Sequence, residues 1–115
     1  MKEIVSKVTC ANKGAARELI VSANLMLLGY EVYRACGPNG KADLVCRNGN
    51  SVLFIEVRQL NIDASGSVRF LIKETDDCDF YAGVLDDGSV VYSPREEQHK
   101  GRKYRTGKNK KILAA

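Results

Sequence analysis

The stretch "KADLVCRNGNSVLFIEVRQ", residues 41–59, contains two runs with strand character separated by a tight turn. The runs are rich in Val, Leu, Ile and Phe, and the polar triplet Asn-Gly-Asn at 48–50 lies between them, which is typical of a β-hairpin with a two-residue loop. Each arm of this hydrophobic hairpin carries a carboxylate, Asp43 in the first and Glu56 in the second. A buried strand would normally have an apolar side chain at such a position, so the two acids point to a function.

The register of the hairpin decides whether these carboxylates meet. A loop of Gly49 and Asn50 places Asp43 directly opposite Glu56, while a loop of Asn48 and Gly49 makes the two acids diagonal neighbours on the same face. A regular three-residue loop would separate them onto opposite faces, unless a bulge restored the parity. The face without the acids is apolar throughout and is expected to be core; it comprises Leu44, Cys46, Leu53, Ile55 and Val57.

Arg58 shares the face of Asp43 and Glu56, at the end of the hairpin away from the turn. Two carboxylates about 4.5 to 8 Å apart repel each other unless a cation joins them. Mg²⁺ binds one or two carboxylates together with waters and phosphate oxygens, and such an ion stabilises the charge on a scissile phosphate. The pattern therefore indicates a metal site for phosphodiester hydrolysis. The plainer alternative is that Glu56 reaches solvent at a sheet edge and pairs with Arg58.

An amphipathic helix is expected upstream, with Asn12 as its N-cap and Gly29 at its end. Glu18 lies on the flank of its apolar stripe, which should pack on a sheet and comprises Ala16, Leu19, Ile20, Ala23, Met26 and Leu27. Further strands are expected at 30–36, 67–73, 79–85 and 90–93. These elements predict an α/β domain built on a mixed sheet.

The order of Glu18 on the helix, Asp43, and then "EVR" at 56–58 resembles the PD-(D/E)xK nuclease superfamily. Residues 13–59 are particularly similar to its small single-domain members, which include homing endonucleases and archaeal Holliday junction resolvases. The resemblance covers roughly residues 12–95. It implies the restriction-endonuclease-like fold, a mixed β-sheet with an N-terminal helix packed on it.

By this resemblance Glu18, Asp43, Glu56 and Arg58 would be the catalytic residues. Asp43, Glu56 and the backbone carbonyl of Val57 would bind Mg²⁺ or Mn²⁺, and Glu18 would join them by holding a metal-bound water. Arg58 stands where the family usually has Lys. A guanidinium keeps its charge and binds phosphate with two hydrogen bonds, but it does not deprotonate in proteins. Arg58 would therefore orient a water or stabilise charge, and it would not act as a base.

Several other polar residues have plainer interpretations. Asp76, Asp77 and Asp79 lack the spacing of a calcium-binding loop and are expected to form a solvated turn. His99 lies in a polar segment with no partner recognisable in the sequence, so a catalytic role is not expected. Lys73, on a neighbouring expected strand, is an alternative source of the missing amine.

Positive charge is concentrated at the end of the chain. Eight Lys and Arg but only two acids lie between Arg95 and Lys111, while the rest of the chain has ten basic and twelve acidic residues. We therefore expect a nuclease-like domain at 1–95 and a basic C-terminal tail at 96–115. Such a tail attracts polyanions by counterion release, although a merely solvated tail has the same composition. The residues expected to bind nucleic acid are Lys100, Arg102, Lys103, Arg105, Lys108, Lys110 and Lys111.

The expected function is that of a magnesium-dependent endonuclease that hydrolyses DNA. A domain this small contacts little duplex, so a homodimer is expected. The sequence has no apolar run near 20 residues and no secretory leader, which favours a cytoplasmic protein without membrane partners. Arg58 supports an alternative, a catalytically weakened nuclease-like module that binds nucleic acid without cutting. An RNA-directed nuclease is a third interpretation, because the fold and a basic tail serve either polymer.

Overall fold

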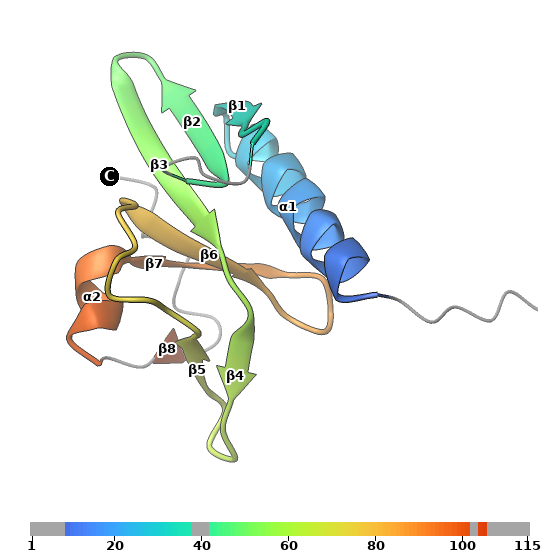
Figure 1. Cartoon of the computed structure of the whole chain (residues 1–115), viewed down its shortest axis with the longest axis vertical. Coiled ribbons are helices and arrows are strands. Elements are labelled where there is room, and N and C mark those ends of the chain that lie inside the picture. Colours follow the sequence, from blue (N-terminus) through green and yellow to red (C-terminus); the bar gives the residue numbers. More distant parts are fainter. Residues whose placement is uncertain (1–8, 38–41, 102–103, 106–115) are drawn as a thin grey trace, which may run out of the picture.

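The structure is a computed structural model that describes residues 9–37, 42–101 and 104–105 of the 115-residue chain. The elements follow one another as shown in Figure 1. Their bounds are α1 Cys10–Leu27, β1 Glu31–Arg34, β2 Leu44–Asn48, β3 Ser51–Val57, β4 Leu60–Ile62, β5 Ser67–Phe70, β6 Phe80–Val84, β7 Val90–Pro94, α2 Arg95–His99 and β8 Tyr104–Arg105.

The main sheet has five strands in the order β1-β2-β3-β6-β7. Strands β3 and β6 are parallel, and the other neighbours are antiparallel. The predicted mixed sheet with an N-terminal helix on it is confirmed, since α1 contacts β1, β2, β3, β6 and β7 along one face. A second sheet of β4, β5 and β8 lies below it in Figure 1. Neither described helix is long and apolar enough to cross a membrane.

The central hairpin has the first of the two predicted registers. Asn48 pairs with Ser51 and Val45 with Phe54, so Gly49 and Asn50 form the loop. Gly49 has a φ of 61°, as a type II′ turn requires at its first position. The hairpin therefore turns without a bulge, and this parity places the acids of both arms on one face.

Apolar clusters lie on both faces of the main sheet. On the α1 side, Leu44, Cys46 and Ile55 are fully buried against Val21 and Leu25 of the helix, as predicted for the apolar face of the hairpin. On the other side a separate cluster joins β5 to β6 and β7; its buried members are Val68, Phe70, Cys78, Tyr81 and Val91. A polar side chain beside this cluster, such as that of Glu56 opposite Tyr81, must therefore find its partners inside the protein.

Helix α1 starts three residues earlier than predicted. Thr9 is the N-cap, and its side chain accepts a hydrogen bond from the Asn12 backbone N–H at 3.2 Å. Asn12 therefore lies inside the first turn, because Thr9 supplies the same capping oxygen three residues earlier. The predicted end is correct: the helix stops at Leu27, and Gly29 follows with a φ of 98°.

The predicted packing face of α1 was wrong. Val21, Ser22 and Leu25 are buried, whereas the predicted stripe, Ala16, Leu19, Ile20, Ala23, Met26 and Leu27, faces solvent. Residues 19–28 are apolar on both sides of the helix, so periodicity could not select the inner face. Asn24 fixes the rotation, since its Oδ1 accepts a hydrogen bond from the Tyr92 hydroxyl of β7 at 2.6 Å.

The segment after the hairpin also differs from the prediction. The strand expected at 67–73 ends at Phe70, so Lys73 lies in the loop that follows β5. Strand β4 was not predicted, because three residues are too few to show an alternating pattern. Leu60 of β4 packs on Gly83 of β6, where a Cβ atom would lie only 2.5 Å from the Leu60 Cγ atom.

This close contact gives a stability test. Gly83→Ala should lower the free energy of unfolding by about 1 to 3 kcal/mol, because the added methyl group overpacks the contact between β4 and β6. The matched control is Gly14→Ala within α1, where an added Cβ meets nothing within 4 Å and should stabilise the helix by about 0.5 to 1 kcal/mol. Chemical denaturation measures both changes; equal effects of the two substitutions would contradict the proposed contact.

Candidate functional site

Asp43 and Glu56 converge at the end of the central hairpin. Asp43 immediately precedes β2 and Glu56 lies in β3, and the register carries them opposite each other. The Asp43 Oδ2 atom accepts a hydrogen bond from the Val57 N–H at 2.9 Å, and the Asp43 backbone donates one to the Glu56 carboxylate. Each acid is thus bound to the backbone of the opposite arm. The geometric requirement stated from the sequence is met.

Glu56 is buried, with only 9% of the residue exposed. Burial raises the pKa of its carboxyl to about 7, and the negative charge of Asp43 acts in the same direction. The Arg58 guanidinium and the backbone hydrogen bond from Asp43 oppose these effects without cancelling them. The raised pKa favours the protonated form of the Glu56 carboxyl, and a bound cation would displace that proton.

Glu18 lies within electrostatic range of this pair. It belongs to the same side of α1 as the buried Val21 and Ser22. Burial raises the pKa of its carboxyl, with a further contribution from the charge of Asp43, whereas Arg34 lowers it. The helix and the hairpin therefore bring the three predicted acids into one electrostatic neighbourhood.

The oxygen-rich donor set suits a hard cation such as Mg²⁺. A cation would offset the repulsion between the Asp43 and Glu56 carboxylates, and burial raises the pKa of the Glu56 carboxyl, so these two acids fit a metal as a pair. Within the described part of the chain, however, no group of three or more His, Cys, Asp or Glu side chains is arranged to hold a metal. Glu18 is therefore a neighbour of the pair and not a ready-made third ligand.

Arg58 joins the pair to the interior. Its guanidinium forms an ion pair with the Glu56 carboxylate at 3.0 Å and a second one, with a hydrogen bond, to the Asp76 carboxylate. The Nε atom of Arg58 is buried and has no hydrogen-bond partner among the described residues. Two carboxylates therefore hold the guanidinium beside the predicted metal pair, while its buried Nε–H donor is unsatisfied among the described residues.

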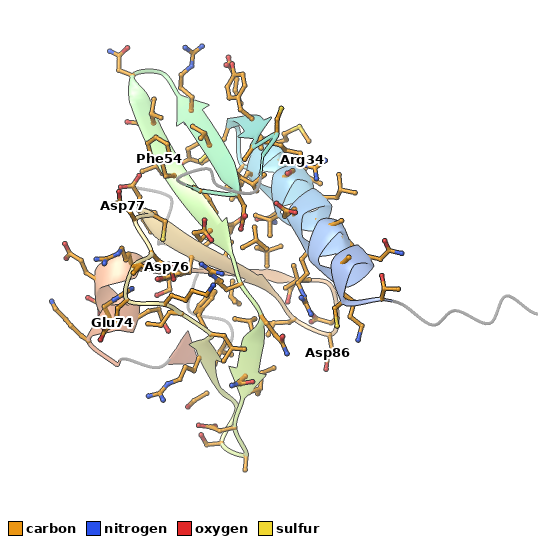
Figure 2. All side chains as sticks on the ribbon, in the orientation of Figure 1. Arg34, Phe54, Glu74, Asp76, Asp77 and Asp86 are labelled. Atoms are coloured by element: carbon orange, nitrogen blue, oxygen red, sulfur yellow. The ribbon has the colours of Figure 1, made fainter. Side chains whose placement is uncertain are left out.

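Asp76 was wrongly predicted to lie in a solvated turn. It is buried, and its Oδ2 atom accepts hydrogen bonds at 2.8 Å from both the Tyr81 hydroxyl and the Lys73 backbone N–H. Asp77 and Asp79, the other members of the cluster, are exposed, and Figure 2 labels Asp76 and Asp77. Burial alone would raise the pKa of Asp76, but these hydrogen bonds and Arg58 together lower it.

His99 continues this chain of contacts. Its Nε2 atom lies 2.8 Å from the Tyr81 hydroxyl, and the two rings are stacked with centroids 6.0 Å apart. His99 therefore has a partner that could not be recognised in the sequence, and the expectation that it has no catalytic role stays a prediction. We define the buried relay as Arg58, Asp76, Tyr81 and His99. Sequence reasoning missed it because its members belong to separate elements and loops and share no regular spacing; the packing of α2 adds His99 to the contacts that the sheet and the loop after β5 already make.

Most of the predicted nucleic-acid-binding residues cannot be placed. Lys100 follows α2 and is exposed, and Arg105 contributes its backbone to β8, which pairs with β5. The remaining five, Arg102, Lys103, Lys108, Lys110 and Lys111, lie outside the described residues. The buried Gln98 shows that packing continues into α2, and its Oε1 atom accepts a hydrogen bond from Phe70 at 3.3 Å. The division of the chain at residue 95 stays a prediction.

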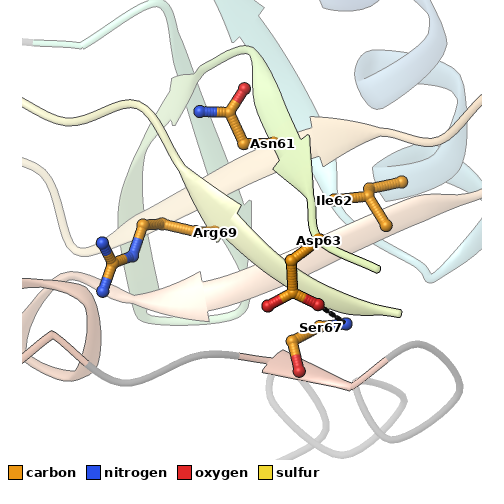
Figure 3. Close-up of a pocket in the computed structure, with 5 residues that line it drawn as sticks. All are labelled: Asn61, Ile62, Asp63, Ser67 and Arg69. Carbon is orange, nitrogen blue, oxygen red and sulfur yellow. Dashed lines mark hydrogen bonds between the residues drawn. The ribbon is translucent and has the colours of Figure 1, made fainter. Parts of the chain in front are cut away.

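A shallow pocket of about 260 Å³ lies on the β4–β5 hairpin (Figure 3). It is lined by Asn61, Ile62, Asp63, Ser67 and Arg69. The Asp63 carboxylate is occupied within the turn, where its Oδ1 atom accepts a hydrogen bond from the Ser67 backbone at 3.0 Å. None of the predicted site residues lines this pocket.

The chain shares its fold with a nuclease. No protein-family model matches the sequence, and no curated protein matches it. Among solved structures it is similar to "a bacterial homing endonuclease: I-Ssp6803I", with a TM-score of 0.69 and 16% sequence identity. The match covers 83% of this chain and 72% of that chain. The predicted nuclease-like fold is thereby confirmed; an identity this low establishes the fold alone.

The burial of Glu56 predicts a pH-dependent stability. Its pKa is about 7 in the folded protein against an ordinary value of 4.5, so folding favours the protonated form and this stability is lost as the pH rises from about 4.5 through 7. Glu56→Gln cannot ionise. In the presence of a chelator it should unfold like the wild type near pH 4 and be more stable by about 2 to 3 kcal/mol at pH 8.

Chemical denaturation at several pH values measures this difference. Glu31→Gln is the matched control, because Glu31 is exposed and its ion pair with Arg47 should contribute little at any pH. A Glu56→Gln effect that does not change with pH would contradict the assigned environment of Glu56.

Proposed function

We propose that the chain is a metal-dependent endonuclease of the PD-(D/E)xK type that hydrolyses DNA phosphodiester bonds. The observation that supports this most directly is the convergence of Asp43 and Glu56 at one end of the hairpin, each bound to the backbone of the other arm. The fold shared with a homing endonuclease supports the same class of function. A cytoplasmic location is part of this proposal.

Asp43 and Glu56 would bind Mg²⁺ or Mn²⁺ with the carbonyl of Val57, and Glu18 would orient a water beside them. When bound, the ion supplies charge stabilisation at the phosphate and a more acidic water. The hydrogen bond from Val57 fixes one oxygen of Asp43 and leaves the other oxygen available. Glu56 must release its proton to become a ligand, so metal affinity should rise with pH up to and through neutrality.

Arg58 would bind the phosphate that is cut. Its guanidinium already lies 3.0 Å from Glu56, and its planar fork can form two hydrogen bonds to phosphate oxygens. We assign Asp76 as a positioning residue. Its ion pair with Arg58, supported by the contacts of Tyr81 and His99, keeps the guanidinium from pairing with Glu56 alone. Arg58 does not act as a base, so the attacking water loses its proton to bulk solvent or through Glu18.

The ion pair between Arg58 and Glu56 also supports a second candidate function. A guanidinium that already pairs with Glu56 partly replaces a metal there, and such a site could bind nucleic acid without cutting it. A catalytically weakened nuclease-like binding module is therefore the alternative. DNA is the expected polymer, and RNA is the alternative to be compared in the same assays. The basic tail would contact phosphates without reading sequence.

A cleavage assay tests the first candidate. Supercoiled plasmid, branched junctions and single strands, each with Mg²⁺, Mn²⁺ or chelator, should show metal-dependent nicking or cutting by the wild type. Asp43→Asn should reduce the rate on the order of 100-fold, as expected for loss of a metal ligand. Asp86→Asn, at an exposed acid after β6 (Figure 2), should leave it unchanged.

The outcomes separate the two functions. Binding without cleavage of any substrate in either metal would reject the enzyme and favour the binding module. Arg58→Lys then distinguishes two forms of that module: a gain of cleavage shows an assembled site that lacks its amine, and no gain together with no Mn²⁺ binding shows that the carboxylates are structural.

The basic tail can be tested without cleavage. Replacing Lys108, Lys110 and Lys111 together with Gln should weaken DNA binding and reduce the slope of log K against log salt by up to about 2.7, which is about 0.9 for each lost phosphate contact. Fluorescence anisotropy at several salt concentrations measures the slope, with RNA of the same length as a parallel ligand. An unchanged slope would reject a phosphate-binding role for these lysines.

A further inference from the structure

Helix α1 presents a second apolar face to solvent. Leu19, Ile20, Met26 and Leu27 are 55%, 39%, 57% and 87% exposed, and the small residues Ala16 and Ala23 continue the same stripe. We call these six residues the outer stripe of α1. Their helical spacing places them opposite the inner face formed by Val21, Ser22 and Leu25, so the C-terminal half of the helix is apolar on both sides.

This half of the helix has no charged side chain. From Leu19 to Tyr30 the chain contains no Asp, Glu, Lys or Arg, although one side of the helix faces water. A helix that is apolar all round is buried in its functional state. A nucleic acid would require positive charge here, so the stripe cannot be a phosphate-binding surface. It is suited to another apolar and uncharged surface.

We propose that the outer stripe of α1 is the dimer interface of this protein, with α1 of a second copy packed against it in the antiparallel direction. The exposed parts of Leu19, Ile20, Met26 and Leu27 amount to between two and three full aliphatic residues, on the order of 400 Å², which is within the range of the largest apolar patch on a soluble monomer and is often functional. A dimer buries about 600 to 800 Å² on each partner. The stripe supplies the apolar centre of such an interface, and its polar margin supplies the remainder.

The charge distribution on α1 favours a second copy of this helix as the partner and an antiparallel arrangement of the two helices. An uncharged stripe does not repel itself, and a two-fold axis makes one patch complementary to its own copy. Lys13 is exposed near the start of α1, and the last turn contains no basic residue. Antiparallel packing brings Lys13 to the partially negative end of the partner helix, whereas parallel packing would place two Lys13 side chains together. Ala16 and Ala23 allow the helices a close approach.

The dimer leaves the candidate site accessible. Glu18 lies on the side of α1 that also carries Val21 and Ser22, and Arg58 and Asp76 belong to the relay with Tyr81, which is buried in the second core. The outer stripe contains none of these residues. The pairing is therefore independent of the proposed cleavage, and mass measurements test it even if the protein cuts nothing.

Sedimentation of the full chain over about 5 to 100 µM provides the first test. The wild type should be a dimer whose melting temperature rises with concentration. Leu27→Glu should be a monomer with an unchanged circular dichroism spectrum, because Leu27 makes few contacts within its own chain. The matched control is Val52→Glu, at a β3 position that is 47% exposed, which should remain a dimer. A monomeric wild type, or a dimeric Leu27→Glu, would overturn the proposal.

Cross-linking tests the direction of packing. Cys10 and Cys36 are exposed and are first replaced by Ser. In that background Ala23→Cys, near the middle of the stripe, should be joined to its copy by a short bismaleimide. Asn12→Cys, near the helix start, should not be joined, because antiparallel helices would separate these two positions by on the order of 25 Å. Cross-linking of Asn12→Cys without Ala23→Cys would reject the antiparallel arrangement.

Discussion

The parity of the central hairpin is the constraint on which the rest of the structure depends. Pairing of Asn48 with Ser51 across a two-residue loop fixes every side chain of β2 and β3 to one face. One face then supplies apolar residues to the α1 core, and the other presents the acids. A shift of a single residue would bury Asp43 and Glu56 among the apolar side chains of α1 and expose Leu44 and Ile55.

The second face of the sheet shows how a protein keeps charges inside. Arg58 lies between two carboxylates, and Asp76 is held further by Tyr81 and a backbone N–H. Each buried charge thus has an opposite charge and hydrogen bonds, which is the condition for keeping it ionised. For Glu56, burial and the charge of Asp43 outweigh the Arg58 guanidinium, and the pKa of its carboxyl is raised.

Much of the site was readable in the sequence because it depends on local rules. The turn residues at 48–50 set the parity, and Gly29 ended the helix where expected. The partners of Asp76 and His99 were not readable. Tyr81 lies between them in the chain with no regular spacing, and they meet only because α2 folds back onto β5 and β6.

The sequence by itself determined the central hairpin, the mixed α/β fold and, for either two-residue loop, the placement of Asp43 and Glu56 on one face, because strand alternation and turn chemistry act over a few residues. The tertiary structure decided which side of α1 is inside, since a helix that is apolar on both sides has no preferred face until Asn24 bonds to Tyr92. It also decided the environment of Arg58. Burial and long-range hydrogen bonds are properties of the packed chain, and no short pattern of residues encodes them.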